Sequence, residues 1–325
     1  MPVGTAEAPA APARPDKPEL VPPKQIPSLK ASPLPLNVYT LHNLAHIELN
    51  AIDLAWDTVA RFSGLGLPDD FYADFARVAD DEARHLRWCL QRLGELGYEY
   101  GCMPAHNLLW EGAEMSSGDL FARLAIVPMS QEARGLDAGK RLAEKLVGWG
   151  DNRTAAIVHQ IALEERNHVA VGVSWFQAIS DALGVDPGPT FRSLLLELCP
   201  DLLKGPFNHD ERGVAGLPRS WYDLTLWPQH ERQAADAKRR DEGAPKAAAA
   251  AEQQRQQPDG LQGAAEDENR SHQCGDSAGS SGSLSLLGRP YECLGLAPGL
   301  PESDQQLQRL RHQLATMLEI ELRAS

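Results

Sequence analysis

Two copies of one pattern of acids and histidines constrain the fold of this chain more than any other feature. In the first copy, the single glutamate Glu48 is followed, one helix further on, by Glu82-Ala83-Arg84-His85. In the second copy, at nearly the same spacing, Glu132 is followed by Glu165-Arg166-Asn167-His168. One glutamate and then one Glu-x-x-His, used twice, is the ligand set of a carboxylate-bridged two-metal site inside a four-helix bundle. The pattern predicts a fold and a site, but it names no substrate.

The position of each acid on its predicted helix strengthens this interpretation. Glu82 lies among the apolar residues Ala79 and Leu86, so it falls on the face that should be buried. Each of the four glutamates has such a position, and each histidine, three residues after an acid, shares its face. One buried charge already costs several kcal/mol, whereas two divalent cations would balance four carboxylates. The predicted metal ligands are Glu48, Glu82, His85, Glu132, Glu165 and His168.

The ligand types also indicate which metal is expected. Carboxylate and imidazole together favour iron, with manganese as the alternative, over a thiolate zinc site or an all-oxygen calcium site. We therefore expect two iron ions as the cofactor.

Composition divides the 325 residues into five stretches. Residues 1–36 are rich in Pro and Ala and predict an extended, disordered leader. Residues 37–180 hold four long helical patterns, with a crossing connection of about twenty residues after the second, as in bundles with a long crossover. Residues 181–230 are expected to add helices that close the bundle. Residues 231–289 have the composition of a low-complexity linker, and residues 290–325 predict an amphipathic tail helix. The expected fold is all-α, a four-helix bundle with extra C-terminal helices.

Caps and prolines locate the expected helix ends. The first helix is predicted to begin with Asn37 as its N-cap and to end near Phe62. Pro128 is predicted to kink the third helix one turn before Glu132. Asp151 is predicted to cap the fourth helix.

Charge and cysteine content limit the partners and the cellular compartment that are expected for the protein. The formal net charge of −14 argues against a nucleic-acid surface built on Lys and Arg. No apolar run approaches the ~20 residues of a membrane helix, and no secretory pattern is present at the N-terminus. Five scattered cysteines, an odd number, indicate free thiols in a reducing compartment. We expect a cytoplasmic protein.

Several residues near the pattern leave two interpretations open. Asp81 and Glu164, each just before a motif glutamate, either hydrogen-bond to the ligand imidazoles or to Arg84, or are surface charges. Small residues such as Ala162 and Gly172 either leave room for oxygen or substrate or allow close helix packing. Four histidines lie off the ligand positions and are interpreted as core or surface residues: His42, His46, His106 and His159.

The sequence around these residues resembles two groups of proteins. Asp81-Glu82-Ala83-Arg84-His85 is similar to the Asp/Glu-Glu-x-Arg-His signature of di-iron oxygenases in the ferritin-like superfamily, whereas Glu164-Glu165-Arg166-Asn167-His168 lacks the arginine. The chain resembles more closely the family called domain of unknown function 455, over residues 37–226. The matching stretches are Leu44-Ala45-His46-Ile47-Glu48, Glu82-Ala83-Arg84-His85, Pro104-Ala105-His106 with Trp110, Glu132-Ala133-Arg134-Gly135-Leu136-Asp137 and Gly205-Pro206-Phe207-Asn208.

This resemblance implies a ferritin-like bundle that binds metal, and it brings no substrate with it. By analogy with the superfamily, Glu82 and Glu165 would bridge the two ions. Glu48 with His85 would complete one ion, and the remaining pair, Glu132 with His168, would complete the other. Family members are often longer before the first bundle helix, so the resemblance leaves open a further helical segment there.

Three functional hypotheses fit the predicted site. The first is an oxidoreductase in which two ferrous ions reduce oxygen and a small-molecule substrate is oxidised or hydroxylated, with electrons from a donor protein. Within this class, resemblance to tRNA-hydroxylating relatives keeps an RNA substrate under consideration, although the acidic charge weighs against it. The second hypothesis is peroxidase or catalase-like chemistry at a di-manganese or di-iron centre. The third is a metal-binding or interaction protein without turnover.

Overall fold

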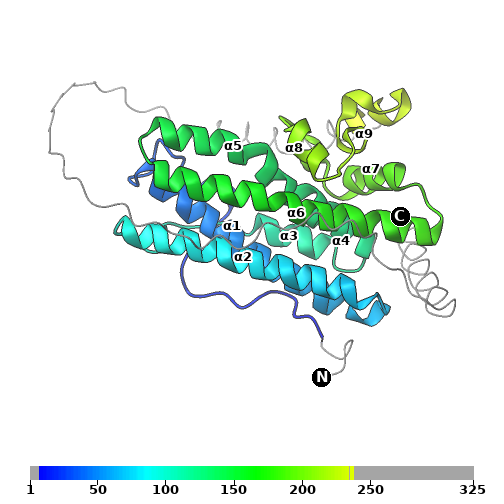
Figure 1. Ribbon diagram of the computed structural model, residues 1–325, viewed down its shortest axis with the longest axis horizontal. Helices are drawn as coiled ribbons and strands as arrows, with labels where there is room; N and C mark the ends of the chain where they lie inside the picture. Colours follow the sequence, from blue (N-terminus) through cyan, green and yellow to red (C-terminus); the bar gives the residue numbers. More distant parts are fainter. Residues whose placement is uncertain (1–6, 234, 238–325) are drawn as a thin grey trace, which may run out of the picture. The chain divides into compact units, whose positions relative to one another are not determined.

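The computed structural model describes residues 7–233 and 235–237, and every regular element in this part of the chain is helical. Four long helical segments of the described residues form a bundle, as Figure 1 shows. Helix α1 packs against α2, α5 packs against α6, and α2 also contacts α6. The prediction of an all-α four-helix bundle is confirmed. Its segments are α1 (Leu36–Arg61), α2 (Asp69–Glu95), α4 (Leu120–Ile126) continued by α5 (Ala133–Gly148), and α6 (Asn152–Leu183).

The connections between these segments follow the predicted order. A short loop with the 3-10 turn η2 (Ser63–Leu65) joins α1 to α2, and residues 149–151 join α5 to α6. Between α2 and α4 the chain crosses the bundle over residues 96–119. This crossover contains a short helix, α3 (Leu108–Met115), which the sequence analysis did not predict.

The first helix begins differently from the prediction. Pro35 precedes it, and Asn37 lies within its first turn rather than at the N-cap. The Asn37 amide instead donates a hydrogen bond of 2.8 Å to Asp151. Asp151 is the N-cap of α6, as predicted, and accepts from the backbone N–H of Thr154 at 2.9 Å. Asn37 therefore ties the start of α1 to the start of α6.

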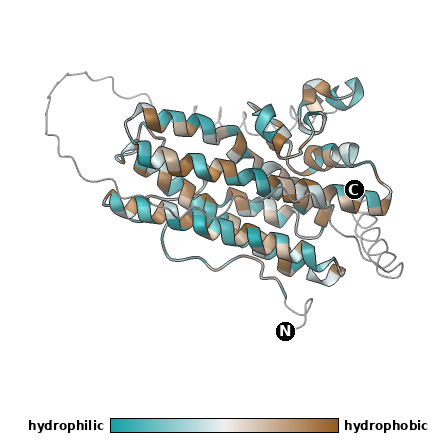
Figure 2. Ribbon diagram, in the orientation of Figure 1, coloured by the Kyte–Doolittle hydropathy of each residue, from teal (hydrophilic) through white to brown (hydrophobic). Residues whose placement is uncertain are grey.

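Buried apolar faces hold the helices together. Figure 2 shows polar and apolar residues alternating along the same helices, which is the pattern of amphipathic segments packed on one core. On α2 the buried face includes Phe71, Phe75, Cys89 and Leu93, as the sequence pattern predicted. All seven residues of α4 are buried, so this short helix runs through the interior.

A π-helical turn interrupts the third bundle segment at Pro128. The turn spans Val127–Gln131 and separates α4 from α5. Proline has no backbone N–H to donate, and the N–H of Glu132 donates instead to the carbonyl of Val127, five residues back, at 3.1 Å. The predicted break is confirmed in position. Its form is a widened turn, which changes the direction in which Glu132 leaves the helix.

The crossover is fixed to α1 by a buried arginine. Arg123 on α4 has no exposed surface. Its guanidinium donates to the carboxylate of Asp57 at 2.5 Å and to the carbonyl of Ala113 on α3 at 2.8 Å. A fully buried cation requires such partners, so this pair locates both α3 and α4 against α1.

Residues 7–35 of the expected leader form defined contacts with the bundle. Residues 7–35 are irregular apart from the 3-10 turn η1 (Pro23–Gln25) and an isolated bridge to the crossover. In that bridge, Ala105 donates to the carbonyl of Glu19 at 2.9 Å, and Val21 donates to the carbonyl of Ala105 at 2.8 Å. Proline restricts the unfolded chain, so an extended, proline-rich segment loses less entropy when such bonds hold it.

The chain after α6 forms small helices that pack on the bundle. They are α7 (Pro187–Leu198), α8 (His209–Val214) and α9 (Arg219–Tyr222), with the 3-10 turns η4 (Pro200–Leu203) and η5 (Leu224–Leu226). Buried Arg212 on α8 binds the Asp137 carboxylate of α5 through two hydrogen bonds of 2.8 and 2.6 Å. Most of the predicted linker and the whole predicted tail helix lie outside the described residues.

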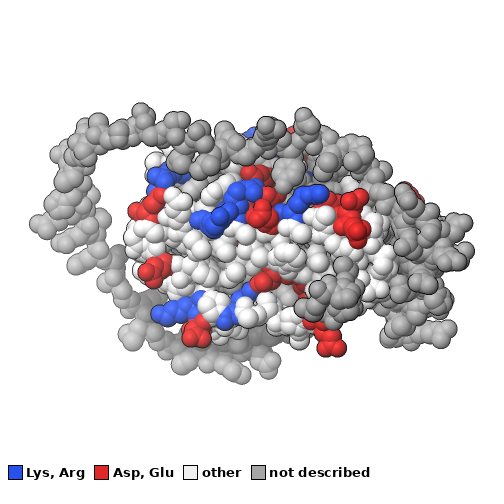
Figure 3. All heavy atoms as spheres, turned by 60° about the horizontal axis from the view of Figure 1, so that its bottom comes forward, with Lys and Arg blue, Asp and Glu red and all other residues white. Residues whose placement is uncertain are grey.

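The described surface carries charges of both signs. On the face in Figure 3, basic and acidic side chains lie beside one another in an upper and a lower row, and the band between the two rows is mostly without charge. This face therefore offers no extended basic surface among the residues that are described. None of the helices in the described part of the chain is long and apolar enough to cross a membrane.

Candidate metal centre

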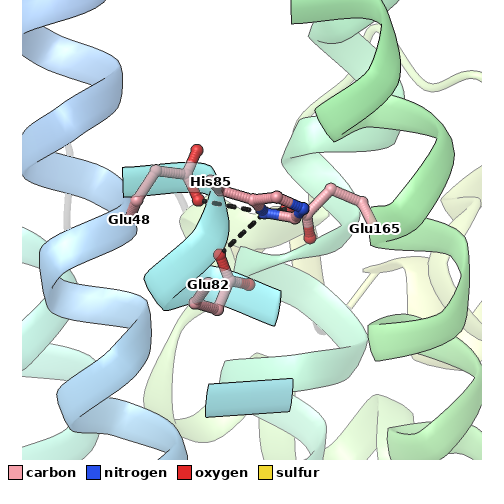
Figure 4. A group of neighbouring side chains, drawn as sticks. All are labelled: Glu48, Glu82, His85 and Glu165. Atoms are coloured by element: carbon pink, nitrogen blue, oxygen red, sulfur yellow. Dashed lines mark hydrogen bonds and ion pairs between the residues drawn. The ribbon is translucent and has the colours of Figure 1, made fainter. Parts of the chain in front are cut away.

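The six predicted ligands come together in the interior of the bundle as two overlapping groups. In the first group, Glu48 from α1, Glu82 and His85 from α2, and Glu165 from α6 each offer an atom within 4.8 Å of the others (Figure 4). The second group consists of Glu82, Glu132, Glu165 and His168, with the same limit. The two shared residues are Glu82 and Glu165, the pair that the resemblance assigned as bridging.

These side chains are buried to different degrees. The relative exposures of Glu48, Glu82 and Glu165 are 2%, 0% and 5%. Both histidines are also buried, whereas Glu132 is half-buried. Glu132 lies at the junction of the π-helical turn and α5.

Each histidine turns its Nδ1 atom toward the carboxylates. Nδ1 of His85 lies 3.2 Å from Oε2 of Glu82 and 3.5 Å from Oε2 of Glu48. Nδ1 of His168 lies 2.8 Å from Oε1 of Glu82 and 3.3 Å from Oε2 of Glu165. Glu82 thus places one oxygen next to each imidazole, as a carboxylate between two ions would.

The opposite ring nitrogens are held by acids from the other motif. Nε2 of His85 lies 2.9 Å from Oε2 of Glu164, and Nε2 of His168 lies 3.5 Å from Oδ2 of Asp81. Arg84 joins the two acids, with a 2.7 Å hydrogen bond to Asp81 and an ion pair to Glu164. Of the two interpretations left open by the sequence, contact with the imidazoles is therefore confirmed and free surface charge is wrong. Such partners fix the orientation of a ligand imidazole.

Three buried atoms in the cluster have no hydrogen-bond partner among the described residues. They are Oε1 of Glu82, Oε2 of Glu165 and Nδ1 of His168. The first and the last are only 2.8 Å apart, yet they are not aligned for a hydrogen bond. Two atoms that bind one ion at ~2.1 Å with a right angle between them lie about 3 Å apart. The spacing and the missing partners fit atoms that converge on a cation, so the donor set suits a metal.

Burial and mutual repulsion perturb the carboxyl groups. Burial, followed by the neighbouring Glu82, raises the pKa of Glu48 well above its usual value. Burial, followed by Glu165 and Glu82, has the same effect on the pKa of Glu132. Burial also acts to raise the pKa of Glu82, but the adjoining His168 imidazolium outweighs it and holds that pKa well below the usual value. Without metal, burial and repulsion therefore favour the protonated form of Glu48 and Glu132.

The imidazoles are perturbed in the complementary direction. Burial alone would lower the pKa of His85, but hydrogen bonds to Glu164, Glu48 and Glu82 outweigh it and raise the pKa to about 12. The carboxylates around His168 likewise overcome its burial and raise its pKa well above 6.5. The metal-free cluster thus balances its charge with protons at positions where ions would bind.

A small cavity adjoins the second group only. It has a volume of about 10 Å³ and touches Glu132 and His168 but neither Glu48 nor His85. Its other walls are apolar: Ala55, Phe75, Val78, Val127 and Pro128. This cavity could not be predicted from the sequence, because its walls come from four separate segments of the chain.

The small residues and the additional histidines have structural explanations. An added Cβ at Gly172 would lie 2.7 Å from Cβ of Pro128, and one at Gly139 would lie 2.4 Å from Cβ of Ala162. For Ala162 and Gly172, close packing is therefore the correct interpretation. The four other histidines lie outside both groups: His42 and His46 are buried, His106 is half-buried and His159 is exposed.

The fold and the site together define a helical bundle whose core holds a cluster of carboxylates and histidines that could bind metal. A family model described as "Protein of unknown function (DUF455)" matches residues 3–223, and the chain belongs to this family. The match begins within the leader, whereas the sequence analysis placed its start at residue 37. An uncharacterised protein of Haemophilus influenzae is 38% identical over 216 residues, which cover 64% of this chain and 74% of that protein.

More distant similarity connects the chain with two enzymes. A 3-demethoxyubiquinol 3-hydroxylase of Aromatoleum aromaticum is 28% identical over 109 residues, or 32% of this chain and 52% of the enzyme. An enzyme of the same name from Herbaspirillum seropedicae is 33% identical over 104 residues, or 29% of this chain and 46% of the enzyme. The chain thus spans about half the length of these hydroxylases. No solved structure matches the chain.

Proposed function

We propose that this protein is a di-metal oxidoreductase, with two iron ions in the bundle, that uses oxygen to oxidise or hydroxylate a small organic substrate. The observation that carries the proposal is the convergence of two ligand groups on two shared, buried glutamates. The unpartnered buried atoms of the cluster and the similarity to two hydroxylases support it further.

In this proposal the six ligands have distinct roles. Glu82 and Glu165, which belong to both groups, would hold both ions. The terminal glutamates, Glu48 and Glu132, would each hold one ion together with a histidine. Asp81 and Glu164 orient those histidines through the nitrogen that faces away from the carboxylates. Manganese could occupy the same ligands, because oxygen and imidazole donors suit both metals.

The surrounding residues would control access and charge at the centre. When bound, the iron pair supplies the electrons and the oxygen-binding position that side chains lack. The apolar walls around Glu132 and His168 exclude bulk water from that side of the cluster. Arg84 balances the charge of the two orienting acids and keeps them in place.

The substrate class is proposed from the hydroxylase relatives. Both are named for hydroxylation of a small organic molecule, and the matched segment covers about a third of this chain. We therefore place hydroxylation of a small organic substrate ahead of RNA modification, in line with the net charge of −14.

Anaerobic loading with ferrous iron tests this function. Purified protein is titrated with ferrous iron, the bound metal is counted, and oxygen is then admitted while absorbance and oxygen uptake are followed. We expect about two ions per chain and rapid oxidation of the bound iron. The variant Glu82→Ala should lose both properties, because it removes a shared ligand, whereas Glu144→Ala at an exposed position should keep them.

Other outcomes would support different functions. Protein that binds two ions and consumes peroxide, but does not react with oxygen, would have peroxidase or catalase-like activity. Protein that binds metal and reacts with neither oxidant would be a metal-binding protein without turnover. Failure to bind metal at all would contradict the proposal at its first step.

A further inference from the structure

The two halves of the cluster differ although their ligand sets are the same. On the first half, Nδ1 of His85 is hydrogen-bonded to Glu82 at 3.2 Å. On the second half, Nδ1 of His168 and the nearby oxygens of Glu82 and Glu165 are the atoms without a hydrogen-bond partner among the described residues. The buried atoms that lack a hydrogen-bond partner among the described residues therefore gather on one side of the cluster.

The same side is the one next to the cavity. Its walls include Glu132 and His168, and Glu132 is more exposed than the other three acids. Beyond the first half, by contrast, the core is filled by Ala45, Cys89 and Ile161, whose exposures are 0%, 0% and 4%. Space for a further ligand thus exists beside the second half.

The size and polarity of the cavity indicate what it can hold. A volume of about 10 Å³ corresponds to roughly one water-sized molecule. An ordered water needs two to four polar partners, but five of the seven wall residues are apolar. A small apolar gas fits these walls better than water, and an organic substrate does not fit without a movement of the walls.

Resting on the proposed function, we infer that this cavity is the binding pocket for the diatomic gas, and that the gas reaches the ion held by Glu132 and His168. The π-helical turn builds the pocket, because it supplies the Val127 and Pro128 walls and then Glu132 itself. Gly172 on α6 packs closely against Pro128, and a side chain at position 172 would collide with this proline. Glu48 and His85 do not line this cavity, so the cavity gives no access to the ion that they would hold.

A matched pair of substitutions on α1 tests the inference. Ala55→Val adds two methyl groups at a wall of the cavity, whose volume is about 10 Å³. Ala45→Val makes the same change on the same helix, in the filled core beside the first half. Both variants are loaded with ferrous iron without oxygen, their metal content is measured, and nitric oxide is titrated as a stable diatomic probe, followed by electron paramagnetic resonance and absorbance.

We expect the dissociation constant for nitric oxide to rise by about ten-fold or more in Ala55→Val and to change by less than about two-fold in Ala45→Val. Val78→Ile, which adds a single carbon to another wall, should give a smaller change in the same direction and replaces Ala55→Val if that variant does not fold. Equal weakening in the two alanine variants, or weakening in Ala45→Val alone, would overturn the inference.

The metal count separates this inference from the proposed function. Full metal content with nitric oxide binding that no cavity variant changes would leave the di-metal proposal intact and reject the pocket. A wild-type protein that binds no ferrous iron would reject both.

Discussion

Loading the cluster with metal should release protons, and the number of protons follows from the structure. Without metal, His85 has its pKa raised to about 12 by three carboxylates that outweigh its burial, and the pKa of His168 is also well above 6.5. Burial and repulsion raise the pKa values of the terminal glutamates, Glu48 and Glu132. The protonated form of all four groups is therefore favoured without metal, and each group must lose its proton to bind an ion.

The magnitude can be worked from this count. Four groups give about four protons released per pair of ions, or about two per ion. For each pH unit, the logarithm of the apparent affinity for an ion changes by the number of protons that this ion displaces. Because each ion displaces about two protons, its affinity should rise about 100-fold for each unit of increasing pH. The sign is set by competition: every group has a raised pKa, so lower pH favours the proton and higher pH favours the metal.

Calorimetric titration with ferrous iron or manganese, without oxygen, measures this release directly. The binding heat is recorded in buffers with different heats of ionisation, and the slope against that heat gives the number of protons. Glu48→Gln removes one titrating group, so the release should fall from about four to about three. Glu144→Gln, at an exposed position, is the control and should leave the number unchanged.

A release of fewer than about one proton per pair of ions, or an affinity independent of pH between about 6 and 8, would refute this reasoning. Either result would mean that the imidazoles are neutral before metal arrives. The cluster would then have to balance its carboxylates in some other way, and the protonation assigned to the metal-free state would be wrong.

Three further predictions concern affinity and stability. Glu164→Ala removes the partner of His85 Nε2, so metal affinity should fall by about 10- to 100-fold in a competition titration with a chelator, while saturating metal still fills the site. Gly172→Ala places a methyl group against Pro128 and should cost about 1–3 kcal/mol in a urea unfolding experiment, whereas Gly94→Ala, with open space around the new methyl group, should stabilise α2 by up to about 1 kcal/mol. The melting temperature of metal-free protein should fall as pH rises above about 4.5. In the unfolded chain Glu48 and Glu132 ionise at that pH, whereas in the folded protein their raised pKa values keep the protonated form favoured. Saturating metal should raise the melting temperature and remove this trend.

The sequence predicted the ligands because each of them breaks a regular pattern. On α2, Glu82 and His85 stand where the helical period requires apolar residues, and both are fully buried. The same reasoning located Glu165 on α6. Helical periodicity determines which residues share a face, so it can place a ligand without knowledge of the neighbouring helices.

Features that depend on contacts between distant segments were not predictable in this way. The walls of the cavity come from α1, α2, the π-helical turn with Glu132, and α6, and no single stretch of sequence contains their pattern. Helix α3 is short and depends on Arg123, which binds Ala113 and Asp57 together. The leader has a composition typical of disorder, and its backbone hydrogen bonds to Ala105 cannot be predicted from composition.

The surroundings of Glu132 differ from those of Glu48 in a way that the two-fold sequence pattern does not predict. Its sequence relation to Glu165 and His168 copies that of Glu48 to Glu82 and His85, so the sequence alone predicts two equal half-sites. Proline at position 128 breaks this equality, because the π-helical turn that it causes lies directly before Glu132 and nowhere near Glu48. Glu48 therefore lies within a continuous helix, whereas Glu132 lies at an interruption that also supplies walls of the cavity beside it. Chemistry with an external molecule requires that difference, since two equally closed half-sites would hold metal but admit nothing to it.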